Sequence, residues 1–123
     1  MSKKIMIVDD DPSILISIRE LFEKQGFEVY AVNSGMDCIK ELERGFKGVI
    51  LMDIMMPIMD GYETIQKIIQ QGLHKNNIIS ILTAKDAPNP KYKELNNYIR
   101  DYIQKPFNLT ELAKTVDNYF NKS

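Results

Sequence analysis

Five side chains of this sequence are ionisable or carry a hydroxyl group, and they stand at the ends of short apolar runs. They are Asp9, Asp10, Asp53, Thr83 and Lys105. Three carboxylates brought close together repel one another, so a group of this kind is costly unless a cation lies among them. If the chain folds so that these positions meet, the sequence implies a site for a hard divalent ion.

Magnesium suits such a group, because it takes oxygen ligands and commonly binds one or two carboxylates together with a phosphate. Asp53 could then act as a nucleophile toward a phosphoryl group, with the ion and Lys105 neutralising charge on the group in transfer. Thr83 would donate a hydrogen bond to a phosphoryl oxygen. The alternative is that these residues are helix caps, strand ends and a surface cation, which accounts for any one of them but not for their common position.

The elements that must position these side chains alternate between strand length and helical period. We expect strands at 5–8, 27–32, 48–52, 78–82 and 99–104, and helices at 12–25, 34–44, 61–71, about 91–97 and from 109 onward. The run at 48–52 is apolar at consecutive positions, which suits a strand with both faces covered. We therefore place it at the centre of the sheet.

Two helix starts carry capping residues. Asp11 precedes Pro12, as an N-cap with proline at the first helical position does. Asn108 and Glu111 form a capping pair for the last helix. On its buried side we expect Leu109, Leu112, Ala113, Val116 and Phe120.

Five strand–helix units with short connections predict an α/β fold, with one parallel sheet and helices on both faces. We expect a single domain over residues 1–123. In such sheets the ligand binds beyond the carboxyl ends of the strands, where the five polar side chains fall.

The composition excludes several classes of function. Lys plus Arg (16) nearly balance Asp plus Glu (17), so a charge-driven role on nucleic acid is not expected. No apolar run reaches the roughly 18 residues of a membrane span, and we expect a cytoplasmic protein without membrane contact. Cys38 is predicted to be a buried helix residue, and His74 a solvent-exposed loop residue.

Four motifs in order resemble those of one known family. They are residues 7–12 (IVDDDP), 51–61 (LMDIMMPIMDG), 82–85 (LTAK) and 101–107 (DYIQKPF). Over essentially its whole length the chain resembles the receiver domain of two-component response regulators, the CheY-like family. The resemblance implies a flavodoxin-like sheet with strand order 2-1-3-4-5.

The resemblance also implies a chemistry. Asp53 would be phosphorylated by a sensor histidine kinase or a histidine phosphotransfer protein. Asp10 and the backbone carbonyl of Met55 would bind Mg²⁺ directly, together with Asp53, while Asp9 acts mainly through water; Mn²⁺ is an expected substitute. Lys105 would contact the phosphate and be joined to Pro106 by a cis peptide bond.

Members of this family signal when a threonine moves to the phosphate and an aromatic residue of the last strand turns inward; Thr83 and Tyr102 match these positions. The chain also departs from the family. Tyr98-Ile99 replace the usual small residues, and Pro88 and Pro90 are expected to shorten or shift the helix near 91–97. These changes fall on the face most members use to engage their targets.

Dephosphorylation is expected to be slow. In this family the positions of Met55 and Lys85 tune how fast water attacks the phosphoryl group. Here Met55 would shield the phosphate, and Lys85 offers no carboxylate to orient water.

We expect a stand-alone receiver with no effector domain, which catalyses only its own phosphorylation and dephosphorylation. Two roles remain open: a relay that passes the phosphoryl group onward, and a switch that binds a target when phosphorylated.

Two other classes of protein are alternatives. The first is an aspartate-nucleophile phosphatase, but those enzymes usually place a second catalytic Asp where Met55 stands. The second is a degenerate interaction module that works without phosphorylation, but none of the five key side chains is missing.

Overall fold

Five parallel strands form the centre of the computed structural model, which describes residues 3–84 and 89–121. The strands are β1 (Lys4–Val8), β2 (Glu28–Val32), β3 (Val49–Asp53), β4 (Ile78–Thr83) and β5 (Ile99–Gln104). Their order in the sheet is β2-β1-β3-β4-β5. All five residues of β3 are buried, which confirms the prediction of a central strand covered on both faces.

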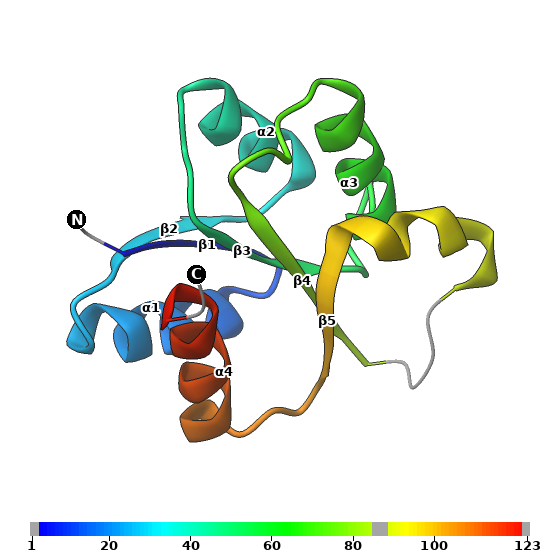
Figure 1. Cartoon of the computed structure of the whole chain (residues 1–123). Coiled ribbons are helices and arrows are strands. Elements are labelled where there is room, and N and C mark those ends of the chain that lie inside the picture. Colours follow the sequence, from blue (N-terminus) through cyan, green and yellow to red (C-terminus); the bar gives the residue numbers. More distant parts are fainter. Residues whose placement is uncertain (1–2, 85–88, 122–123) are drawn as a thin grey trace.

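Helices cover both faces of the sheet, as predicted (Figure 1). On one face lie α1 (Pro12–Lys24) and α4 (Leu109–Asn121), and on the other lie α2 (Gly35–Glu43), α3 (Gly61–Gln70) and the 3₁₀ helix η1 (Pro90–Tyr98). Successive side chains of a strand point to opposite faces. Val49 and Leu51 therefore join the core under α1 and α4, while Ile50 and Met52 join the core under α2 and α3.

Local hydrogen bonds fix where the helices near the site begin. The side chain of Asp11 accepts from the backbone N–H of Ser13 at 2.9 Å, and that of Asn108 accepts from the N–H of Glu111 at 3.0 Å, which confirms both predicted caps. Asp60 and Glu63 form a capping box at the start of α3. Helix α3 therefore starts at a defined point just beyond β3.

Some side chains lie elsewhere than predicted. Leu109 was expected on the buried side of the last helix but is 40% exposed, and Tyr119 is buried in its place because its hydroxyl group reaches Ser80 at 2.8 Å. His74 is half-buried rather than exposed, since its ring packs edge-on against Tyr98 with centroids 5.2 Å apart.

The connection between β4 and β5 differs from a regular α-helix. Pro90 occupies the first turn of η1, and the backbone at Tyr92 (φ −109°, ψ 26°) departs from helical geometry. Lys85 and Pro88, which entered the sequence-based predictions, lie outside the described residues. Within residues 3–84 and 89–121, the helices are all too short or too polar to cross a membrane.

Candidate functional site

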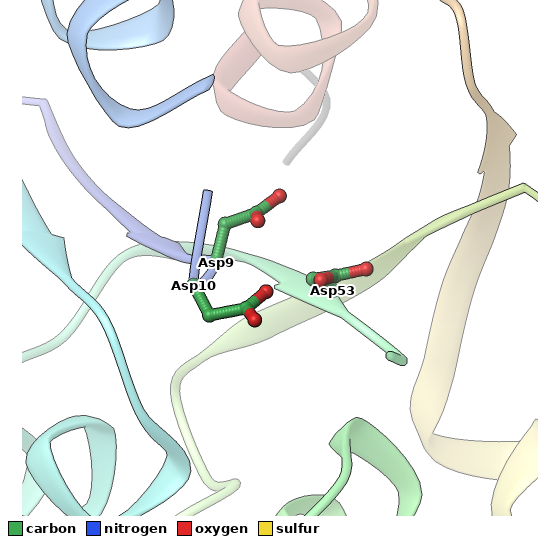
Figure 2. A group of neighbouring side chains, drawn as sticks. All are labelled: Asp9, Asp10 and Asp53. Atoms are coloured by element: carbon green, nitrogen blue, oxygen red, sulfur yellow. The ribbon is translucent and has the colours of Figure 1, made fainter. Parts of the chain in front are cut away.

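Three carboxylates meet at the carboxyl edge of the sheet. Asp9 and Asp10 directly follow β1, and Asp53 is the last residue of the neighbouring strand β3. One oxygen atom from each carboxylate lies within 4.8 Å of the others. Figure 2 shows these side chains projecting from the two strand ends into the same region. The predicted grouping of the three residues is therefore present in the folded chain.

Asp9 is the most enclosed member of this acidic cluster. It is fully buried, and one carboxylate oxygen (Oδ1) accepts the backbone N–H of Asp11 at 2.9 Å. The other (Oδ2) accepts a hydrogen bond from the ammonium group of Lys105 at 2.8 Å. Asp10 is exposed instead. The two adjacent carboxylates thus lie in different environments: Asp9 is held by hydrogen bonds within the protein, and Asp10 faces solvent.

Lys105 bridges the cluster from the far end of the sheet. Its Nζ atom lies 2.8 Å from Asp9 Oδ2 and 3.4 Å from Asp53 Oδ1. Its backbone N–H donates to the carbonyl oxygen of Thr83 at 2.7 Å, and the peptide bond to Pro106 is cis. Burial opposes the charged ammonium, but the hydrogen bonds and charges of the two carboxylates outweigh it, so the pKa of Lys105 is raised.

Asp53 lies in an environment that disfavours its negative charge. Burial, followed by the charge of Asp9, raises the pKa of Asp53 to about 6, while Lys105 and the backbone N–H of Met55 act in the opposite direction. The carboxylate is therefore mostly ionised at neutral pH, at an energetic cost. A divalent cation among these oxygen donors would remove that cost, so the donor set fits Mg²⁺.

Two of the remaining predicted residues, Thr83 and Met55, lie next to Asp53. Thr83 ends β4 and is 5% exposed; it lies beside Asp53 because the latter pairs with Leu82 across the two strands. The side chain of Met55 is 62% exposed, and its backbone N–H donates to Asp53 Oδ1 at 3.3 Å. Metal coordination by its carbonyl oxygen stays a prediction. Tyr102 is half-buried on β5.

A pocket of about 440 Å³ opens next to Asp10. Its other lining residues come from the β3–α3 loop (54–57), from Asp60 and Tyr62 at the start of α3, and from Asn89. Sequence analysis did not identify Tyr62 or Asn89, because a tyrosine in the first turn of a helix and an asparagine between prolines carry no spacing that indicates a site.

Comparison with known proteins agrees with this geometry. Residues 5–117 match the sequence profile of the response regulator receiver domain. The chain belongs to this family. A CheY-like response regulator receiver domain from Methanospirillum hungatei JF-1 has the same fold, with a TM-score of 0.91 and 40% identity over 97% of this chain and 94% of that one. The predicted family and fold class are both confirmed.

Two further relatives give this receiver domain a context. The alkaline phosphatase synthesis transcriptional regulatory protein PhoP of Bacillus subtilis is 33% identical over 100% of this chain but 50% of its own length. This chain thus spans about half the length of the curated relatives it matches. The receiver domain of sensor histidine kinase PA1611 from Pseudomonas aeruginosa PAO1 (TM-score 0.85, 27% identity, 99% and 100% coverage) has a magnesium ion coordinated in its active site cleft.

Proposed function

We propose that this receiver domain accepts a phosphoryl group onto Asp53 from a sensor histidine kinase or a histidine phosphotransfer protein, in a reaction that needs Mg²⁺. The observation that carries this proposal is the acidic cluster, where oxygens of Asp9, Asp10 and Asp53 lie within 4.8 Å of one another beside the ammonium group of Lys105. Two-component receivers as a class receive their signal from histidine kinases, and this chain belongs to that class.

In the proposed reaction a carboxylate oxygen of Asp53 attacks the phosphorus atom of a phosphohistidine. The new P–O bond forms as the P–N bond breaks, and the imidazole nitrogen keeps the electron pair. Because Asp53 is mostly ionised at neutral pH, it needs no separate base to activate it. Lys105, already 3.4 Å from Asp53 Oδ1, stays close enough to balance the charge of the transferred group, and Thr83 donates a hydrogen bond to it.

The metal would be held by Asp10, Asp53 and the backbone carbonyl of Met55, with Asp9 acting through water. When bound, it neutralises negative charge on the carboxylates and on the phosphoryl oxygens. The hydrogen bonds of Asp9 support this proposed division, since both of its carboxylate oxygens already accept from Asp11 and Lys105. Mn²⁺, which accepts the same oxygen ligands, is proposed to substitute for Mg²⁺.

The phosphorylated domain is proposed to switch partner binding, or to pass the phosphoryl group onward, rather than to turn over a substrate. Met55 stands two residues beyond Asp53, where an aspartate-nucleophile phosphatase would need a second acid, and this favours a signalling domain over an enzyme. We further propose that the partners are proteins in the cytoplasm, and that this domain itself contacts neither nucleic acid nor membrane. Thr83 and Tyr102 are the proposed switch residues.

The test is the intact mass of the protein after incubation with acetyl phosphate, with Mg²⁺ or with EDTA. The natural chain should gain one phosphoryl group only with Mg²⁺, and Asp53→Asn should gain none. Asp11→Asn is the matched control: Asp11 is an exposed aspartate beside the cluster, and asparagine also caps helices well, so this variant should be phosphorylated normally. An adduct on Asp53→Asn, or none on the natural folded chain, would refute the proposal.

A further inference from the structure

Three tyrosine side chains gather where α3, η1 and β5 meet. Tyr62, in the first turn of α3, is 3% exposed, and its ring stacks on that of Tyr92 with centroids 4.5 Å apart and planes 12° apart. Tyr102 of β5 packs against the same core cluster. The ring of Tyr62 therefore has little freedom, and its hydroxyl group is held in one place.

That hydroxyl group contacts the start of η1. The oxygen of Tyr62 accepts the backbone N–H of Asn89 at 3.3 Å. Asn89 is the N-cap of η1, where its side chain accepts the N–H of Lys91 at 3.0 Å. Tyr62 thus fixes the point at which the chain leaving Thr83 enters η1.

Tyr102 contacts η1 through its own hydroxyl group. Burial raises the pKa of Tyr102 to about 12, and the charge and hydrogen bonding of Tyr62 add to this effect. The hydroxyl group of Tyr102 also donates to the side-chain oxygen of Asn96 in η1 at 2.5 Å. Any movement of Tyr102 therefore changes its contact with η1.

Tyr62 is placed rigidly relative to the phosphorylation site. The preceding residue, Gly61, donates its N–H to the carbonyl oxygen of Ile54 at 2.9 Å. A Cβ atom at Gly61 would lie 2.4 Å from the carbonyl oxygen of Asp53, so only glycine allows this approach. A short series of contacts therefore joins Asp53 to Tyr62, and Tyr62 to η1 at Asn89; Tyr102 contacts the same helix at Asn96.

We propose that Tyr62 is a positioning residue of this receiver, whose hydroxyl group holds the start of η1 at Asn89, keeps Tyr102 through η1 in the arrangement seen here, and thereby opposes the change made on phosphorylation. This inference rests on the proposed function, because Thr83 and Tyr102 are its switch residues. Tyr102 contacts Asn96 of η1, so an inward turn of Tyr102 breaks that contact unless η1 moves, and the contact between Asn89 and Tyr62 resists such a movement of η1. Loss of the hydroxyl group favours the switched arrangement.

The test compares Tyr62→Phe with Tyr98→Phe. The first variant keeps the stacked ring and removes only the hydroxyl group; the second removes a hydroxyl group from a tyrosine that is 42% exposed at the other end of η1. Three quantities are measured: amide hydrogen exchange at Asn89, the ring NMR signals of Tyr102, and the phosphorylation rate with acetyl phosphate and Mg²⁺.

In Tyr62→Phe we expect exchange at Asn89 and phosphorylation each to become about three- to tenfold faster, the effect of one hydrogen bond. The Tyr102 signals should move toward their positions in the phosphorylated natural chain, and Tyr98→Phe should change none of these. Unchanged Asn89 exchange or Tyr102 signals, an unchanged phosphorylation rate, or equal effects in the control would overturn the inference. If the natural chain takes no phosphoryl group, the proposed function fails, while Asn89 exchange still tests whether Tyr62 holds this connection.

Discussion

Replacing Asp53 with asparagine should stabilise the fold at neutral pH, although it removes the phosphorylation site. The side chain is 5% exposed, and its pKa is raised from 3.8 to about 6 by burial and by Asp9. A shift of one pKa unit corresponds to about 1.4 kcal/mol, so holding Asp53 ionised in the native state costs up to about 3 kcal/mol. Asparagine has nearly the shape of the protonated acid and carries no such cost.

The sign of the pH dependence follows from the same shift. Between pH 3.8 and about 6 the native state binds the Asp53 proton more tightly than the unfolded chain does. Tighter binding of this proton raises the free energy of unfolding. That stabilisation is fully present below the pKa of Asp53 in the unfolded chain and is lost as pH rises through its pKa in the folded protein. The advantage of Asp53→Asn over the natural chain should therefore grow by about 2–3 kcal/mol over this interval and level off above it.

The assay is urea unfolding of both proteins in EDTA, at several pH values from about 4 to about 8. The control is Asp117→Asn, which removes a partly exposed carboxylate paired with Lys3 at 2.8 Å and should destabilise slightly, by less than about 1 kcal/mol. If the difference between Asp53→Asn and the natural chain is independent of pH, the electrostatic account of the site is wrong. Mg²⁺ should stabilise the natural chain more than the variant, because the variant lacks one carboxylate of the cluster.

Three further predictions concern the scaffold. Ile58 has a left-handed backbone (φ 70°) and a fully exposed side chain, so Ile58→Asn should raise the free energy of unfolding by about 1 kcal/mol in urea melts; Asn76 already occupies this conformation (φ 66°), and a loss of stability would contradict the strain argument. Gly35→Ala should lower the free energy of unfolding by about 1–3 kcal/mol, because the new Cβ would lie 2.1 Å from Thr64 Oγ1. An unchanged urea midpoint would contradict this and show that α2 and α3 separate easily. Cys38 is fully buried and its thiol pKa is raised to about 12, so it should react with a thiol reagent only as the protein unfolds; rapid labelling of the native protein would disprove this.

Much of the fold could be predicted from local patterns. The strand at Val49–Asp53 is apolar at consecutive positions, and the helix at Pro12–Lys24 has its cap and apolar face within one segment. Asp9, Asp10 and Asp53 could be placed at one edge because parallel strands end on the same side of a sheet. Strand order came from the resemblance to receiver domains, since the short connections alone do not determine it.

Contacts between distant segments could not be predicted in the same way. Lys105 was expected at the phosphate, but its pairing with Asp9 joins residues 96 positions apart. Tyr119 replaces Leu109 on the buried side of α4 because Ser80 of β4 offers its hydroxyl group a partner inside the core. The helical period of a sequence shows which residues share a face of the helix. It does not show which polar group lies opposite that face on a neighbouring strand.

The sequence by itself determined which residues could form the site, because residue type and position at a strand end are local properties. Only the tertiary structure decided the pKa values of those residues and how tightly the side chains around them are held in place. The raised pKa of Asp53 depends on burial and on the charge of Asp9, and the placement of Tyr62 depends on the close approach of Gly61 to the Asp53 carbonyl. Both result from packing segments that lie far apart in the chain, so neither leaves a pattern within any one of them.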